Sequence, residues 1–203
     1  MGLKEIEHWK TARGSKISAR SFNIEIETLL LVFEYAKEDL RIILENPVAR
    51  IKKRKLDKKQ SIIPIKSQFA AFIKEIKITP QAKATASFVE FLAYSGLRLG
   101  EAKEVLWRDV NFEAGTLFVT GGEIGTKNRE ARLIPLFQPL ERLLKKMKET
   151  CFDINPNDRI FKIESAKKAI AGACKRLKFP RWGHHTMRHF FTVMQLKQES
   201  ILK

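Results

Sequence analysis

The chain has 203 residues, 44% of them apolar, and its 39 lysines and arginines against 23 acidic residues give a formal charge of +16. This apolar content supports a packed core and excludes a wholly disordered chain. No apolar run approaches the roughly 18 residues that span a bilayer, and no N-terminal stretch has the pattern of a signal peptide. Only Cys151 and Cys174 are present, which excludes a disulfide scaffold or a cysteine zinc site and favours a reducing, cytoplasmic setting.

The basic residues predict a polyanionic partner, since the sequence pI is near 10. Nucleic acid is favoured over a membrane surface because nothing resembles a lipid anchor. The C-terminal residues 161–203 are strongly basic, and seven of the ten residues of Arg50–Lys59 are basic. Such a run is typical of a solvated linker or of a segment that lies along a phosphate backbone, and the two are compatible.

The N-terminal part predicts two helices. Residues 3–12 form a short one, and residues 18–40 place apolar side chains at helical spacing, with Ser18 as the N-cap. Asn46-Pro47 prevents the helix from continuing. We expect a domain boundary near residues 52–62, where the basic run lies.

The second part predicts helices, then a small antiparallel sheet, then helices. The expected helices are 67–76, 82–94, 98–105, 139–149, 165–177 and one that begins near His185. The expected strands lie at Val110, at 116–120 and at 129–134, with turns at Asn111–Gly115 and Gly121–Gly125. The fold class is therefore α+β and mostly helical.

The first candidate site is Ser95-Gly96-Leu97-Arg98-Leu99-Gly100-Glu101. Gly96 permits a sharp bend between two helices. Arg98 lies in the first turn of the new helix, where Glu101, three residues on, can fix its guanidinium and aim it at a phosphate. An ordinary surface pair of charges remains the alternative.

The second candidate is Lys127, which follows Gly125-Thr126 at or near the tip of a predicted hairpin. A lysine there can reach into a groove and donate a proton, or it can be a solvated hairpin side chain. The third is His185 with Arg188, which share a helix face and both donate to anionic oxygens; helix-cap packing is the alternative. No acidic or cysteine ligands cluster there, so we expect no metal.

Together, the pattern S-G-L-R-x-G-E, a G-T-K hairpin and H-x-x-R-H resembles the catalytic domain of tyrosine recombinases, the phage integrase family. The helix that begins near Ala19 and the Asn46-Pro47 stop resemble the last half of that family's helical core-binding domain. The resemblance implies an incomplete core-binding domain over residues 1–52, a basic linker over 53–62 and a catalytic domain over 63–203. The linker residues that would contact DNA are Lys52, Lys53, Arg54, Lys55, Lys58 and Lys59.

The resemblance implies site-specific recombination or integration of double-stranded DNA through a 3′-phosphotyrosyl intermediate, as in mobile elements. Arg98, Arg188 and His185 would surround the attacked phosphate. Lys127 would be the general acid for the leaving oxygen, and Glu101 would orient Arg98. The family needs no cofactor or metal, and it acts as a tetramer on DNA.

The family pattern also implies a nucleophilic tyrosine well beyond Arg188. Tyr35 and Tyr94, the tyrosines of this sequence, do not match that position, so we expect a catalytic domain that is incomplete at its C-terminus. Such a chain would bind DNA without forming the covalent link by itself. The alternative is a non-catalytic architectural or regulatory DNA-binding protein derived from an integrase.

Overall fold

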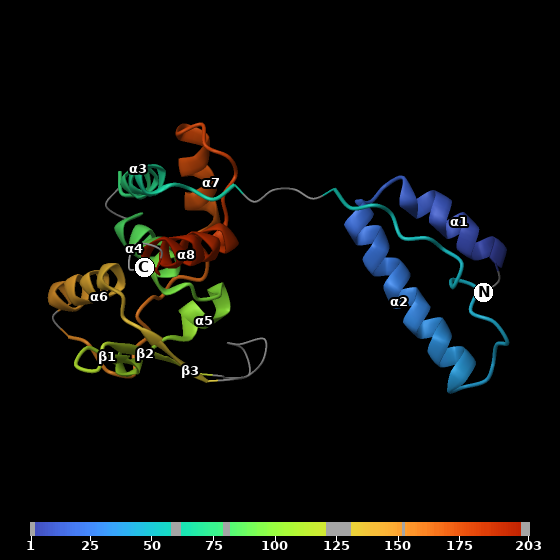
Figure 1. Ribbon diagram of the computed structural model, residues 1–203, viewed down its shortest axis with the longest axis horizontal. Helices are drawn as coiled ribbons and strands as arrows, with labels where there is room; N and C mark the ends of the chain where they lie inside the picture. The colour runs from blue at the N-terminus through green and yellow to red at the C-terminus, as the bar shows by residue number, and fades with distance from the viewer. Residues whose placement is uncertain (1–2, 58–61, 79–81, 121–130, 152, 200–203) are drawn as a thin grey trace. The chain divides into compact units, whose positions relative to one another are not determined.

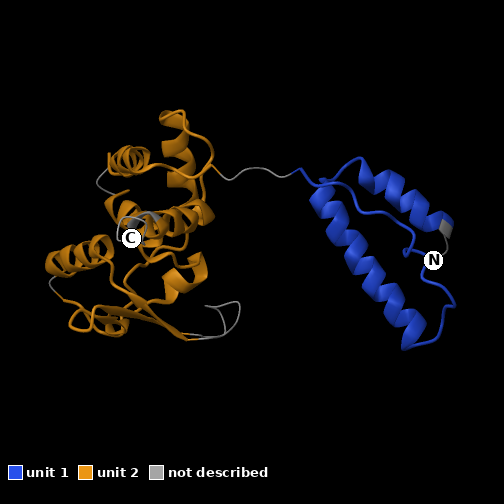
Figure 2. Ribbon diagram, viewed as in Figure 1, with its two compact units in different colours: residues 1–60 blue, residues 61–203 orange. Residues whose placement is uncertain are grey.

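The computed structural model describes residues 3–57, 62–78, 82–120, 131–151 and 153–199. The chain divides into two compact units, Met1–Gln60 and Ser61–Lys203 (Figure 2). Each unit has its own cluster of buried apolar side chains. Among the described residues, no helix is long and apolar enough to cross a membrane.

Unit 1 is a pair of helices, α1 (Leu3–Gly14) and α2 (Ala19–Glu38), followed by an irregular segment (Figure 1). Ser18 caps α2 as the sequence predicts, because its hydroxyl accepts a hydrogen bond from the Ser21 amide at 3.1 Å. The buried apolar residues of this unit are Ile6, Phe22, Ile26, Val48 and Ile51. Since two of these follow α2, the irregular segment packs back onto the helix pair.

Unit 2 is mostly helical with a small antiparallel sheet (Figure 1), which confirms the predicted fold class. Its helices are α3 (Lys66–Ile76), α4 (Lys83–Ser95), α5 (Leu99–Glu104), α6 (Gln138–Thr150), α7 (Lys167–Arg176) and α8 (His184–Glu199). A 3-10 turn, η2 (Trp107–Asp109), leads into the strands β1 (Val110–Asn111), β2 (Thr116–Val119) and β3 (Arg132–Pro135). The strands are ordered β1-β2-β3, and Val119 pairs with Arg132.

Helix α4 is the centre of unit 2 and packs against α3, α6 and α8. The helix is rich in alanine and phenylalanine, so most of its surface is apolar and can pack against other helices. Phe88, Phe91 and Leu92 are fully buried. Helix α8 contributes Phe190, whose ring stacks on Phe69 of α3 with the centroids 4.5 Å apart. This packing fixes the helix on which the predicted residues His185 and Arg188 lie.

Gly96 ends α4 in the left-handed conformation, with φ 65°, and its amide donates to the Leu92 carbonyl oxygen at 3.2 Å. A Cβ atom at this position would lie 2.4 Å from the ring of Phe191 on α8. Only glycine satisfies both the backbone angle and this close approach. The predicted bend is therefore present, and α8 packs directly against it.

Candidate functional site

The carboxylate of Glu101, whose side chain is fully buried, lies between two arginines. Its Oε1 accepts a hydrogen bond from Nη1 of Arg98 at 3.0 Å, and its Oε2 accepts from the Arg98 backbone amide at 2.9 Å. Oε2 also accepts from Nη2 of Arg132 at 2.7 Å. One carboxylate thus closes the first turn of α5, as in a capping box, and holds two guanidiniums.

Two opposing effects act on the pKa of Glu101. Burial raises it, while the hydrogen bonds from Arg132 and from the backbone and side chain of Arg98 lower it by more. The net result is a pKa below the usual glutamate value. Glu101 is therefore a carboxylate at neutral pH and can hold both guanidiniums permanently.

Arg188 approaches the same region from α8, where its Nη1 donates to the Gly96 carbonyl oxygen at 2.8 Å. Burial lowers the pKa of Arg188, the positive charge of Arg98 lowers it further, Glu101 opposes this, and Arg132 also lowers it. Gly96 lies two residues before Arg98, so this hydrogen bond brings Arg188 to the turn that precedes Arg98, and we call Arg98, Glu101, Arg132 and Arg188 the arginine cluster. Arg98 and Arg188, which the sequence predicts in one site, thus both lie at the turn between α4 and α5.

The two neighbouring histidines at the start of α8 have different surroundings. His185 is exposed and lies one turn before Arg188, so the two share a helix face. His184 points back into the protein, where its Nε2 accepts a hydrogen bond from the Ala166 amide at 3.2 Å, just before α7. Burial lowers the pKa of His184, and the charges of His185 and Lys167 lower it further. His184 therefore holds the start of α8, and His185 is accessible to a ligand.

The basic run after unit 1 divides into exposed and packed residues. Lys52 and Lys55 are exposed. Lys53 is exposed too, but its Nζ lies 2.7 Å from Oε1 of Glu27 on α2. The contribution of these lysines to DNA binding stays a prediction.

Arg54 is half-buried within unit 1. Its Nη1 donates to the Gly14 carbonyl oxygen at 2.7 Å, and its guanidinium carbon lies 4.0 Å from the centroid of the Phe22 ring. These contacts give Arg54 a structural role that the sequence did not indicate. Three further predicted residues, Lys58, Lys59 and Lys127, lie outside the described residues.

Arg132 is a member of the cluster that the sequence reasoning missed. The sequence predicts a strand at this position and no role for the side chain. Burial alternates along β3, where Arg132 and Ile134 are half-buried while Leu133 is exposed, but the order of residues Arg-Leu-Ile-Pro does not reveal this pattern. A charged residue on the covered face of a strand needs a partner, and Glu101 is that partner.

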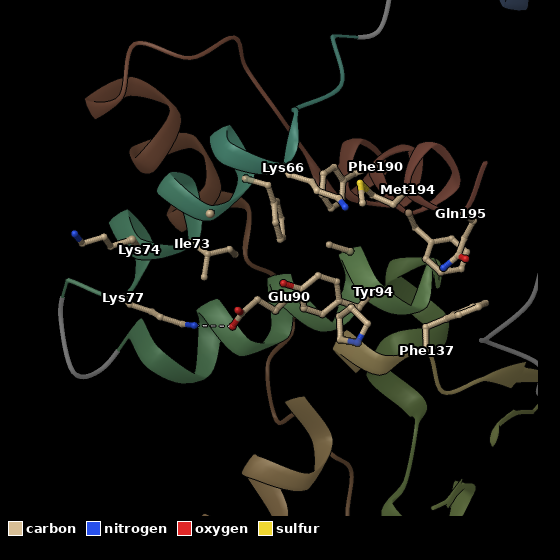
Figure 3. Close-up of a pocket in the computed structure, with 15 residues that line it drawn as sticks. Lys66, Ile73, Lys74, Lys77, Glu90, Tyr94, Phe137, Phe190, Met194 and Gln195 are labelled. Carbon is tan, nitrogen blue, oxygen red and sulfur yellow. Dashed lines mark hydrogen bonds and ion pairs between the residues drawn. The ribbon is translucent and has the colours of Figure 1, made fainter. Parts of the chain in front are cut away.

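Unit 2 also contains an apolar groove of about 560 Å³ between α3, α4 and α8 (Figure 3). Phe69, Ile73, Phe190 and Met194 are among its lining residues. Lys77 at its edge forms an ion pair with Glu90 at 2.7 Å. Tyr94 also lines it, and burial, with a smaller effect of Glu90, raises the pKa of Tyr94 to about 12. Arg98, Arg132 and Arg188 are not among the lining residues, so the groove is separate from the arginine cluster.

Comparisons with known proteins agree with this architecture. Residues 65–200 match the model of the phage integrase family. A Haemophilus influenzae protein that carries the name integrase/recombinase is 26% identical over 161 residues, which cover 74% of this chain and 52% of that protein. This chain thus spans about half the length of the curated relative that it matches.

Two solved structures show the same fold. One is a lambda integrase dimer, residues 75–356, bound to a COC′ core site, with a TM-score of 0.76, 20% identity, and coverage of 98% of this chain and 74% of that chain. The other is the Tn1549 transposon integrase in complex with transposon right end DNA, with a TM-score of 0.75, 16% identity, and coverage of 98% and 73%. From the family match over most of its length, the chain belongs to the phage integrase family.

Proposed function

We propose that the chain acts in site-specific recombination or integration of double-stranded DNA, with the cluster around Glu101 as the site that receives the phosphate. The observation that carries this proposal is that Arg98 and Arg132 both hold one buried carboxylate, that of Glu101, while Arg188 binds the Gly96 carbonyl oxygen two residues before Arg98. Three guanidiniums with one carboxylate leave an excess of positive charge and N–H donors, which suits a phosphate diester. Membership of the phage integrase family supports the same function.

In the proposed reaction, a tyrosine hydroxyl at a position that neither Tyr35 nor Tyr94 matches gives up its proton to water, and its oxygen bonds to the phosphorus. The bond from phosphorus to the 5′ oxygen breaks, and that oxygen takes up a proton. Negative charge grows on the non-bridging oxygens meanwhile, and Arg98, Arg188 and His185 donate hydrogen bonds to them. Lys127 supplies the proton to the leaving oxygen. Glu101 orients Arg98 and is not itself a proton donor, because its pKa is lowered.

Both units contribute to DNA binding in this proposal. Residues 1–52 are part of a core-binding domain, residues 53–62 are a linker whose lysines follow the phosphate backbone, and residues 63–203 belong to the catalytic domain. A lambda integrase has been solved as a tetramer bound to a Holliday junction, and we propose that this chain also assembles on DNA. The thiols of Cys151 and Cys174 are free, which agrees with a reducing compartment such as the cytoplasm.

The test is a binding measurement with the full chain. A duplex is selected from a pool of random sequence, and its affinity is measured for Arg98→Ala, Arg188→Ala and the control Arg142→Ala, an exposed arginine on α6. Each of the first two variants should weaken binding about tenfold or more, because each removes charged hydrogen bonds to phosphate. Unchanged affinity in both would overturn the proposed site.

A second candidate function is non-catalytic DNA binding, in an architectural or regulatory role. It is favoured by the position of Tyr94, which lines the groove between α3, α4 and α8 and not the arginine cluster. A nicked suicide duplex discriminates the two functions. We expect no covalent adduct from these 203 residues, and an adduct mapped to Tyr94 or Tyr35 would reject that expectation.

A further inference from the structure

Arg132 connects two segments that are distant in the sequence. It lies at the start of β3, where it pairs with Val119 of β2, and its guanidinium reaches Glu101 of α5, thirty-one residues away. About a third of its side chain is exposed, at 37%, against 0% for that of Glu101. The contact thus joins the edge of the sheet to the helix that follows Arg98.

The two oxygens of Glu101 are used differently. Oε2 accepts from Arg132 and from the Arg98 backbone amide, while Oε1 accepts from the Arg98 guanidinium. With Oε2 occupied in this way, Oε1 is the oxygen left to hold Arg98. Arg98 itself is 42% exposed and is held through Nη1, which leaves further N–H groups of its planar fork for a ligand.

We propose that Arg132 is a positioning residue for the phosphate site, which acts through Glu101 to fix the direction of the Arg98 guanidinium. This inference builds on the proposed function and identifies what sets the geometry of that site. Without Arg132, the buried carboxylate has one donor fewer at Oε2, and it can rotate so that both of its oxygens accept from the Arg98 guanidinium. The N–H groups of Arg98 would then turn toward Glu101 and away from a phosphate.

A simpler effect of Arg132 has to be separated from positioning. Its positive charge alone attracts a polyanion, and its removal weakens DNA binding whatever Arg98 does. The two effects differ in their dependence on Glu101. An effect of charge persists when Glu101 is replaced, whereas positioning through Glu101 disappears with it.

The experiment is a double-mutant cycle in the full chain, with the duplex selected from the random-sequence pool as probe and fluorescence anisotropy as readout. The variants are Arg132→Met, Glu101→Gln and both together, and Arg132→Lys tests rescue by a charge that still donates to a carboxylate. Arg142→Met on α6 is the matched control. Circular dichroism verifies folding, and Arg132→Gln replaces Arg132→Met in the cycle if the latter does not fold, because its amide still donates an N–H.

Positioning predicts that Arg132→Met weakens binding about threefold to tenfold in the native background and less than about twofold beside Glu101→Gln. Arg132→Lys should recover part of the loss, and Arg142→Met should change little. An equal loss in both backgrounds, or no loss at all, overturns the positioning role while Arg98→Ala and Arg188→Ala still weaken binding. If those two variants bind as the native chain does, the proposed function fails instead.

Discussion

The side chain of Asn23 and the backbone of Arg54 exchange two hydrogen bonds across thirty-one residues of sequence. Nδ2 of Asn23 donates to the Arg54 carbonyl oxygen at 2.9 Å, and the Arg54 amide donates to Oδ1 of Asn23 at 2.8 Å. Asn23 is buried, at 8% exposure. The two hydrogen bonds satisfy both backbone groups of Arg54 and hold the basic segment against α2.

Asn23→Ala should destabilise unit 1 by about 1 to 3 kcal/mol, because both backbone groups of Arg54 lose their partners in a poorly hydrated place. Hydrogen-exchange mass spectrometry on peptides from α2 in the full chain measures the loss. Thr28→Ala is the control, since Thr28 is exposed on the same helix. We expect its effect to stay within about 0.5 kcal/mol. Equal exchange in the two variants would contradict the prediction.

Arg54→Lys tests whether Arg54 contributes through the packing of its side chain or through its positive charge. Lysine keeps the charge but cannot both stack its head on Phe22 and donate to Gly14 as the planar guanidinium does. Unit 1 should lose about 1 to 2 kcal/mol of stability in the same exchange experiment. The salt dependence of duplex binding should not change. Arg50→Lys, at an exposed position, is the matched control and should alter neither quantity.

Lys52→Ala and Lys55→Ala should alter the salt dependence of duplex binding and leave the stability of unit 1 unchanged, because both lysines are exposed in the same segment. If each neutralises one phosphate, each substitution should reduce the slope of log affinity against log salt by about 0.9. Duplex affinity measured over a range of salt concentrations gives this slope. Unaltered slopes for both variants would show that the segment is a solvated linker, which the sequence also allowed.

Gly96→Ala should cost more than Gly115→Ala, although both glycines have nearly the same positive φ, 65° and 61°. The backbone strain of alanine is therefore similar, more than about 1 kcal/mol in each. At Gly96 the added Cβ also meets the ring of Phe191, whereas at Gly115 it meets open space. The difference between the two free energies of unfolding, from urea titrations, isolates this contact. Similar decreases in the free energy of unfolding would mean that Phe191 on α8 moves aside without cost.

Stability should fall on acidification because of His184, whose pKa is lowered in the folded chain from 6.5. Below about pH 6.5 the unfolded chain binds a proton at this site that the folded chain does not, so the free energy of unfolding decreases as the pH falls. His184→Gln keeps an acceptor for the Ala166 amide and does not titrate, so its stability should depend less on pH. His184→Ala should also flatten the pH dependence, but with lower stability at every pH because the amide loses its acceptor. Urea titrations between about pH 7 and pH 5 test this, and a native pH dependence in His184→Gln would reject it.

Much of the fold could be predicted because its signals are local. The apolar spacing in residues 18–40 and the cap at Ser18 correspond to α2 at Ala19–Glu38, and Gly96 marks the bend where it occurs. Arg98, Glu101 and Arg188 could be named because short motifs contain them. The contact between Arg98 and Glu101 is likewise local, since it lies within one helical turn.

The contacts that could not be predicted join distant segments. Arg132 meets Glu101 only because the sheet returns to α5, and Arg54 meets Gly14 only because the chain after α2 folds back. Periodicity indicates which face of an element is covered but not what covers it. A charge count also cannot distinguish Arg54, packed on Phe22, from its exposed neighbour Lys55.

The hydrogen bond from Arg188 to the Gly96 carbonyl oxygen has a consequence for how tightly a ligand can be held. A free arginine side chain loses conformational entropy when it is immobilised on a ligand, which reduces affinity. Here one end of the planar guanidinium is already fixed to the turn after α4, so part of that loss occurs on folding rather than on binding. In the proposed function, the remaining N–H groups of Arg188 are preorganised for an oxyanion, and the affinity that they provide would depend on the rigidity of a single glycine turn.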